Sequence, residues 1–244
     1  MPDTDGFELV KLIRTKYDKQ DLTIIGLSGD GDTRLSARFI KNGANDFLKK
    51  PFVQEEFYCR IMHNIETLES MDKIRDTANR DYLTHLYNRQ CFYKLVNQQI
   101  EKARVSLDCF CVAIIEIDNC EEFNTVYHNY GDNVVFGFSQ LFALEFDSHL
   151  IGRLNGTQFV IYLANTEEKE AFDILDEFKE KVKSIRVHVD DYDDENNSIT
   201  VSVSISSDVK FDTNEVWSLT PLLEKCDQLL ERARDAGQDI VVYD

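Results

Sequence analysis

Apolar residues in the first fifty positions fall into two kinds of pattern, one with helical spacing and one of short continuous runs. Spacings of three and four residues are typical of helices, and short buried runs are typical of strands. The first part of the chain is thus predicted to contain helix, strand, helix and strand in turn, at residues 6–17, 22–28, 34–44 and 45–52. Such alternation favours an α/β class with a parallel sheet.

The longest helical pattern covers residues 53–79, where neither glycine nor proline occurs and apolar residues recur every three or four positions. This pattern predicts a linker helix with an apolar seam. The seam is short, and Arg75 interrupts it. Dimerisation through the helix and packing against its own domain are therefore both open alternatives.

A second set of elements begins at residue 80. Helices are predicted at 91–103, 121–146 (interrupted by a loop), 169–185 and 220–237, and strands at 109–118, 149–163, 186–206 and near the C-terminus. The strand segment 149–163 is divided by Asn155–Gly156, and the segment 186–206 by an acidic loop. Because Asn and Gly both tolerate positive φ, the pair predicts a tight hairpin turn.

Charge and composition narrow the classes of partner. The net charge is −18, from 45 acidic and 27 basic residues. This balance disfavours nucleic acid and anionic membranes, which attract clustered Lys and Arg. No leader-like segment opens the sequence, and no run approaches the roughly 18 apolar residues of a membrane span. The six cysteines form no Cys-x-x-Cys pair, so we expect reduced thiols in a cytoplasmic protein.

Three stretches near the N-terminus, "MPDTDGFELVKLIR", "IIGLSGDGD" and "GANDFLKKPF", resemble the second half of a response-regulator receiver domain. The resemblance implies a partial doubly wound fold over 1–55, with Ser28 as the switch hydroxyl, Phe47 as the switch aromatic and Lys50 as the phosphate-binding lysine. The phosphorylated aspartate of that family would precede Met1. We therefore expect the sequence to be a fragment, or to start at an internal methionine, which sequencing upstream decides.

Residues 80–244 resemble a GGDEF domain, the diguanylate cyclase fold. The stretches that carry the resemblance are "RDYLTHLYNR", "IIEIDNCEEFN", "YGD", "GRLNGTQF" and "DQLLERARDAGQD". It implies an α+β domain with a central, mostly antiparallel sheet flanked by helices, joined to the receiver fragment by a linker helix at 56–79. In the opening motif, His85 stands where the family has glycine.

The resemblance also implies a chemistry, in which two GTP molecules are joined to cyclic di-GMP with the help of divalent metal held by carboxylates. In the signature hairpin Asn155 replaces the first glycine, Gly156 remains, Thr157 and Gln158 replace the two acids, and Phe159 follows. Neither replacement can carry a negative charge or act as a general base. We therefore expect a degenerate hairpin and assign no catalytic residue.

The remaining positions of the implied site are mixed. Glu116 stands at the metal-binding strand position with Asp118 close by, and the alternative is that both are exposed strand-end acids. Arg234 stands where the family has a phosphate-binding lysine, and Gln238 replaces an arginine.

Asn124 and Asp132 match residues that read guanine, and the alternative is a helix cap and a loop acid. The family's product-inhibition motif, R-x-x-D, corresponds to Phe146 and His149 and is thus missing.

We therefore expect a regulatory protein of a two-component or cyclic di-GMP pathway that requires no cofactor. Its partners would be other signalling proteins, such as an active GGDEF protein or a histidine kinase. One alternative is a weak or divergent diguanylate cyclase that uses Glu116 and Asp118 in a homodimer. Another is a GTP-binding sensor without turnover that retains Asn124 and Asp132, with Mg²⁺ accompanying the nucleotide.

Overall fold

The structure is a computed structural model, and it describes residues 5–29, 34–118, 131–185, 198–207 and 218–243. The chain divides into two compact units, residues 1–78 and 79–244. Each unit is described by itself.

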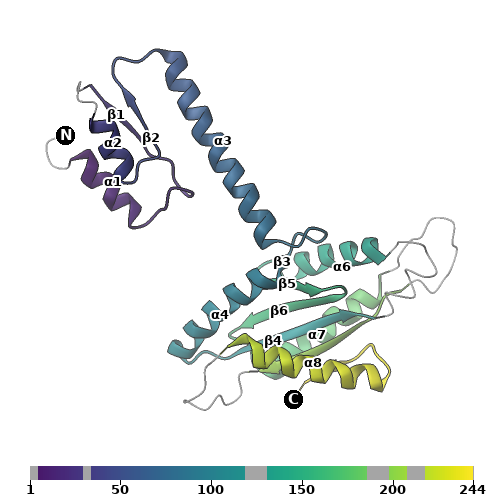
Figure 1. Cartoon of the computed structure of the whole chain (residues 1–244). Coiled ribbons are helices and arrows are strands. Elements are labelled where there is room, and N and C mark those ends of the chain that lie inside the picture. Colours follow the sequence, from purple (N-terminus) through teal and green to yellow (C-terminus); the bar gives the residue numbers. More distant parts are fainter. Residues whose placement is uncertain (1–4, 30–33, 119–130, 186–197, 208–217, 244) are drawn as a thin grey trace, which may run out of the picture. The chain divides into compact units, whose positions relative to one another are not determined.

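The first unit contains the predicted order of elements (Figure 1). These are α1 (Gly6–Arg14), β1 (Ile25–Ser28), α2 (Arg34–Lys41), β2 (Asp46–Lys49) and α3 (Gln54–Asn79). Strands β1 and β2 pair in parallel, with Ile25 opposite Asp46 and Ser28 opposite Lys49. Helix α1 begins after Asp5, whose carboxylate accepts a hydrogen bond from the backbone N–H of Phe7.

Helices α1 and α2 are held to the strands by aromatic contacts and by one arginine. The ring of Phe39 lies 4.3 Å from that of Phe7 and 5.6 Å from that of Phe47, centroid to centroid. Arg14 donates from Nε to the carbonyl oxygen of Gly43 (2.8 Å) and from Nη2 to Oδ1 of Asn45 (2.6 Å). These bonds tie the end of α1 to the turn that precedes β2.

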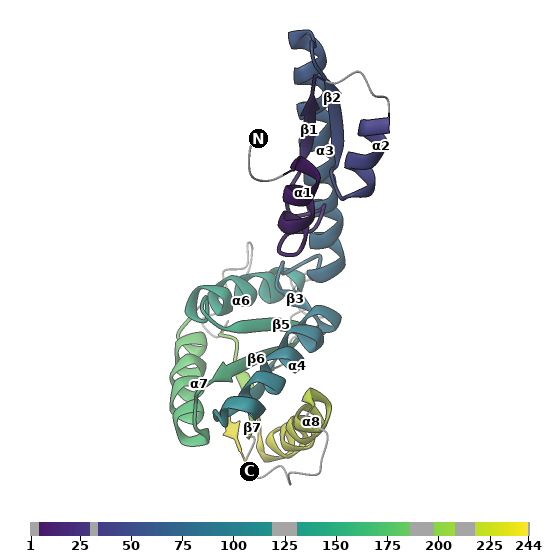
Figure 2. The same ribbon diagram turned by 90° about the vertical axis from the view of Figure 1, so that its left-hand side faces the viewer.

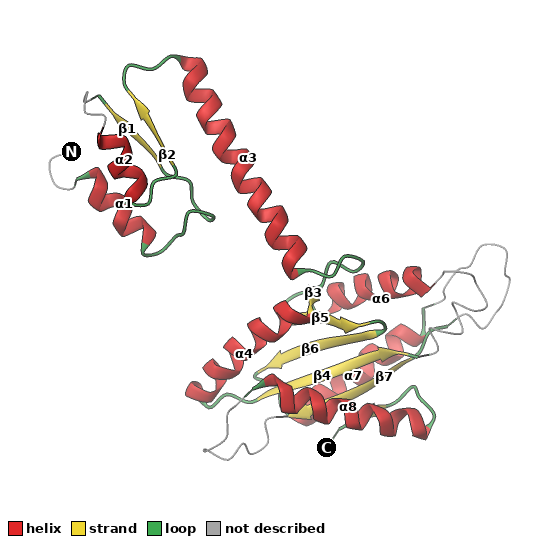
Figure 3. Cartoon of the chain, in the orientation of Figure 1, coloured by secondary structure: helices red, strands yellow, loops and turns green. Residues whose placement is uncertain are grey.

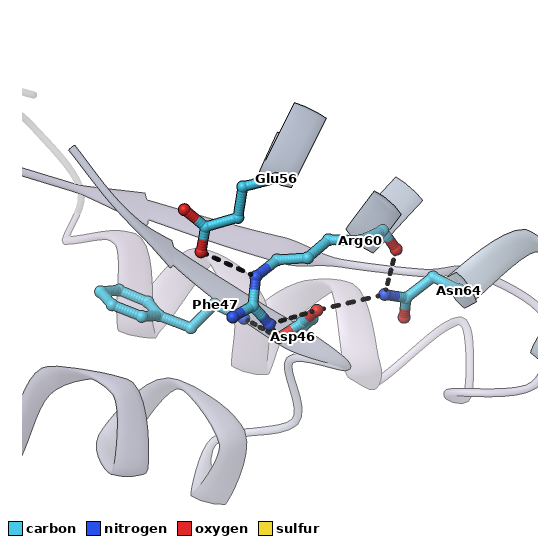
Figure 4. A network of polar contacts seen from close by, with 5 residues as sticks. All are labelled: Asp46, Phe47, Glu56, Arg60 and Asn64. Carbon is cyan, nitrogen blue, oxygen red and sulfur yellow. Dashed lines mark hydrogen bonds and ion pairs between the residues drawn. The ribbon is translucent and has the colours of Figure 1, made fainter. Parts of the chain in front are cut away.

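Helix α3 is bonded to its own unit near its start (Figure 4). Asp46 of β2 accepts hydrogen bonds from Nη1 of Arg60 at 2.9 and 3.1 Å and from Nδ2 of Asn64 at 3.4 Å. Further along the helix, Arg75 forms an ion pair with Asp21 at 3.4 Å. Helix α3 thus makes polar contacts with its own unit, and dimerisation through its apolar residues stays a prediction.

The second unit is built on a six-stranded sheet in the order β3-β5-β6-β4-β7-β8. Its elements are β3 (Tyr87–Asn88), α4 (Arg89–Ser106), β4 (Phe110–Ile117), α6 (Gly131–Glu145), β5 (Leu150–Asn155), β6 (Gln158–Ala164), α7 (Glu168–Lys183), β7 (Val201–Ser207), α8 (Leu219–Ala236) and β8 (Val241–Val242). The three central pairings are antiparallel, and the two edge pairings, β3–β5 and β7–β8, are parallel. The prediction of a mostly antiparallel sheet flanked by helices is confirmed. Strand β3 is not among the predicted elements. The strand predicted before the acidic loop, and the helix predicted after residue 120, lie outside the described residues.

Helices cover both faces of this sheet (Figures 2 and 3). On β4, Val112 and Ile114 pack into the core beneath α4 and α8, whereas Ala113 and Ile115 pack into the core beneath α6 and α7. Burial on both faces explains why this strand is a continuous apolar run rather than an alternating one. The core beneath α6 and α7 is rich in phenylalanine, with contacts among Phe138, Phe142, Phe146, Phe159 and Phe178.

Candidate functional site

Strands β5 and β6 form a hairpin (Figure 1). Its turn lies one residue later than predicted. Strand β5 continues through Asn155, which pairs with Gln158, so the turn consists of Gly156 and Thr157. Only the glycine of the Asn-Gly pair has positive φ, at 27°. Arg153 pairs with Phe159, which leaves one additional residue on β5 before Asn155. The strand is therefore bulged immediately before the turn.

Arg153 fastens this hairpin to the beginning of the second unit. Its Nε and Nη2 donate to the carbonyl oxygen of Gly156 at 3.0 and 2.7 Å, and its Nη1 donates to Oδ1 of Asp81 at 2.8 Å. The same Asp81 oxygen accepts from the backbone N–H and the hydroxyl of Thr84. Burial alone would raise the pKa of the Asp81 carboxyl, but the hydrogen bonds from Arg153 and Thr84 lower it below its ordinary value. We call Asp81, Thr84 and Arg153 the hairpin latch.

The turn that carries the latch contains a residue in an unusual conformation. His85 has φ of 57°, and its backbone N–H donates to the carbonyl oxygen of Asp81 at 2.9 Å. The left-handed region favours glycine, which is the residue that the resemblance places there. Here a residue with a side chain adopts that conformation.

The root of the hairpin lies in the core. Phe159 is fully buried, and its ring centroid lies 4.6 Å from that of Phe138 and 6.0 Å from that of Phe142. This residue therefore anchors β6, whereas the turn that precedes it is at the surface.

Glu116 lies near the end of β4, opposite Gln158 of the hairpin. Gln158 donates from Nε2 to Oε2 of Glu116 at 3.2 Å, and Asn155 donates to Oε1 of Gln158 at 2.9 Å. From helix α8, Nη2 of Arg234 contacts both carboxylate oxygens of Glu116, at 2.6 and 2.5 Å. The structure thus brings together the hairpin, Glu116 and Arg234.

Asp118 has a separate environment. It is 4% exposed and accepts hydrogen bonds from the hydroxyls of Ser202 (2.8 Å) and Thr200 (2.9 Å) and from the backbone N–H of Asp239 (3.2 Å). Burial raises the pKa of its carboxyl in spite of these hydrogen bonds. The alternative in which Glu116 and Asp118 are exposed strand-end acids is therefore wrong for Asp118. This carboxylate joins β4, β7 and the segment after α8.

The comparisons with known proteins assign this arrangement to a family. Residues 78–239 match the family described as "Diguanylate cyclase, GGDEF domain". The chain belongs to the GGDEF family. Residues 1–62 match the "Response regulator receiver domain". The protein thus joins receiver sequence at its N-terminus to a GGDEF domain.

Two curated relatives show how far the likeness extends. The response regulator PleD of Caulobacter vibrioides is 23% identical over 98% of this chain and 53% of its own length. A diguanylate cyclase of Vibrio cholerae is 29% identical over 48% of this chain and 37% of its own length. The chain spans about half the length, or less, of these relatives.

Solved structures share the fold. The coiled coil and GGDEF domain of DgcB from Caulobacter crescentus, solved with c-di-GMP, has a TM-score of 0.68 at 22% identity and covers 78% of this chain and 98% of that chain. The diguanylate cyclase SiaD of Pseudomonas aeruginosa, solved with its activator SiaC, has a TM-score of 0.61 at 22% identity. The match covers 78% of this chain and 72% of the SiaD chain.

Other positions of the GGDEF domain named from the sequence are dispersed. Asn124 lies outside the described residues. Asp132 is exposed in the first turn of α6, and Gln238 follows α8 with φ of 66°. At the positions of the inhibition motif, Phe146 is 3% exposed and the ring of His149 lies edge-on to it at 5.8 Å. Phe146 is thus part of the hydrophobic core, and His149 packs against it.

Two of the receiver positions, Ser28 and Lys50, lie at the ends of β1 and β2, whereas Phe47 lies within β2. The backbone N–H of Lys50 donates to the carbonyl oxygen of Ser28 at 2.8 Å, and Lys50–Pro51 is a cis peptide bond. Phe47 stacks on Phe39. The structure therefore brings Ser28 and Lys50 together at one end of the two strands.

The family implies a divalent cation, and the side chains around Glu116 do not fit one. Magnesium prefers several hard oxygen ligands, usually with at least one or two free carboxylates. Here the hairpin supplies amides and a hydroxyl, Asp118 is occupied by three donors, and Arg234 already contacts both oxygens of Glu116. Within the described part of the chain, no three His, Cys, Asp or Glu side chains are grouped as a metal site.

Sequence reasoning found the altered hairpin and the candidate Glu116 but missed the partnership of Glu116 with Arg234, and also the hairpin latch. The signal for the latch was present, because the aspartate and threonine of the opening motif and the arginine before the hairpin all belong to stretches that matched the family.

No helix in the described part of the chain is both long and apolar enough to cross a membrane.

Proposed function

We propose that this GGDEF domain is non-catalytic and that the protein acts as a cytoplasmic regulator, through contacts with other signalling proteins of a two-component or cyclic di-GMP pathway. The observation that carries the proposal is that the carboxylate of Glu116 already has partners within the chain. The one carboxylate that remains at the implied metal position is bound by Arg234 and Gln158.

The physical argument concerns charge. Phosphoryl transfer depends on positioning and on neutralisation of the developing charge, mostly by divalent metal. At Thr157 and Gln158 the chain presents a hydroxyl and an amide, which carry no negative charge to neutralise a divalent cation and do not act as a general base at neutral pH. A hairpin with this composition is suited to a structural or recognition role.

Support for a role in protein contacts comes from the domain combination and from one relative. Receiver sequence precedes the GGDEF domain, and the solved SiaD structure is a diguanylate cyclase in complex with an activator protein. By analogy, the proposed partners are an active GGDEF protein or a histidine kinase. A second copy joined through α3 is a further proposal, and Met62, Met71 and Ile74 on that helix are exposed.

The test is turnover. The purified chain is incubated with GTP and either Mg²⁺ or Mn²⁺, and cyclic di-GMP is sought by chromatography beside an active diguanylate cyclase. We expect no product above the control without enzyme. Product that disappears in Glu116→Ala would instead establish the alternative of a divergent cyclase.

The sensor alternative has its own measurement. Asp132 is exposed at the start of α6, where a base-reading carboxylate would be accessible. Calorimetric titration with GTP and with ATP decides between the two roles. Selective GTP binding that Asp132→Ala abolishes would favour the sensor, and equally weak or absent binding of both nucleotides favours the regulator.

A further inference from the structure

The contact between Arg234 and Glu116 joins elements that are distant in the sequence. The two residues are 118 positions apart, on α8 and β4. Glu116 is largely buried, with its side chain 17% exposed, whereas the side chain of Arg234 is 45% exposed. The arginine therefore approaches from solvent and covers a carboxylate that the sheet holds in place.

The hairpin completes the contact from the other side. Gln158 uses its donor on Glu116 and its acceptor on Asn155, so its amide is bonded at both ends. A glutamate at position 158 would lose the donor and repel Glu116. The amide at this position and the arginine on α8 thus suit the same carboxylate.

We infer that the Arg234 guanidinium takes the place of a divalent cation as the charge partner of Glu116, and that this internal cation excludes metal from the site. The inference deepens the proposed function, because a site neutralised from within the chain needs no metal to remain folded. It concerns metal binding alone and requires no nucleotide.

The reasoning follows from charge and occupancy. A divalent cation that approached Glu116 would have to displace a guanidinium in direct contact with both oxygens, and it would be repelled by that guanidinium after displacing it. The effect is local, since exposed charges more than about 8 Å apart are largely screened at physiological ionic strength. A neutral residue at position 234 should therefore increase cation affinity far more than the same change elsewhere on α8.

The experiment measures Mn²⁺ binding by electron paramagnetic resonance of the free ion, without nucleotide. Because the native hairpin has no acids, the full chain carries Thr157→Asp as the background, in which Gln158 keeps its bonds to Glu116 and Asn155. In that background we expect Arg234→Met to tighten Mn²⁺ binding by about tenfold or more. Further addition of Glu116→Gln should remove the gain.

The matched control is Arg232→Met, which makes the same change of charge at an exposed position of the same helix. We expect it to change the affinity less than threefold. Equal gains from the two arginine variants, or no gain from Arg234→Met, would overturn the inference. Circular dichroism confirms that each variant is folded, and Arg234→Gln serves as a second neutral variant. Because the readout is metal binding, cyclic di-GMP formation by the native chain would refute the proposed function separately.

Discussion

Replacing Arg153 with methionine should release the hairpin from the beginning of the GGDEF domain. The change removes two hydrogen bonds to Gly156 and one to Asp81, and it leaves a carboxylate without its ion-pair partner. Breaking a buried pair costs about 3–5 kcal/mol, and an exposed pair about 0–1 kcal/mol. The side chains of Arg153 and Asp81 are 10% and 18% exposed, so the case lies nearer the buried limit. We expect a loss of about 2–3 kcal/mol in the free energy of unfolding.

The assay is urea denaturation followed by circular dichroism. Pulse labelling of thiols assigns the transition to the second unit, because Cys226 is fully buried there. Arg104→Met, at an exposed position in the last turn of α4, is the matched control and should cost less than about 1 kcal/mol. A double-mutant cycle with Asp81→Asn should give a coupling energy of about 1–2 kcal/mol.

The pH dependence of the free energy of unfolding tests the same contact in a second way. Since the pKa of Asp81 is lowered in the folded state, its contribution to stability is present above the unfolded pKa of about 4 and is lost as the pH falls through the folded pKa. The native chain should therefore lose more stability on acidification than Asp81→Asn does. The reasoning would be refuted if the effects of Arg153→Met and Asp81→Asn on the free energy of unfolding were additive. It would also be refuted if the native chain and Asp81→Asn lost equal stability on acidification.

Three further predictions concern packing, thiol chemistry and the first unit. Phe159→Ala should destabilise the second unit by about 3–5 kcal/mol and Phe159→Leu by about 1 kcal/mol, measured by the same denaturation, because the ring fills a closed core; equal losses would contradict this. Burial raises the pKa of Cys226 to about 12, so at pH 8 we expect this thiol to resist a disulfide reagent that labels exposed Cys59, and rapid labelling of both would contradict the packing. Arg60→Met should cost only about 1 kcal/mol in thermal denaturation, since its side chain is 40% exposed, and a loss above 3 kcal/mol would show that the Asp46 contact matters more than its exposure implies.

Periodicity of apolar residues was enough to predict most of the fold. The buried run at residues 109–118 and the long helix after residue 53 have patterns that lie within one element, so local spacing identifies them. Strand β3 is only two residues long and exists because Tyr87 pairs with Gly152, which no local pattern encodes. The turn was placed one residue early because a bulge before Asn155 shifts the register, and the bulge depends on how β5 meets β6.

For the candidate site, too, the sequence shows the residue types but not the long-range contacts. Loss of the acids at Thr157 and Gln158 is visible in the sequence, since it concerns residue types at motif positions. The contacts that give those positions meaning are not visible, because they join residues far apart in the chain. Arg234 reaches Glu116 across 118 positions, and Arg153 reaches Asp81 across 72. Likewise, the burial of Asp118 depends on Ser202 of β7, which lies 84 positions away.

The hairpin has a buried root and an exposed tip, and this difference bears on how such a domain evolves. Phe159 is held by the core, whereas Asn155 is exposed; Gly156 is exposed too, but its φ of 27° favours glycine. Selection for a stable fold therefore acts on the phenylalanine and on the glycine of the turn, and only weakly on an exposed side chain such as that of Asn155. Once selection for turnover is relaxed, the tip can drift through neutral substitutions while the scaffold persists. The eroded motif would then be the trace of relaxed selection on a domain that is still maintained for its shape.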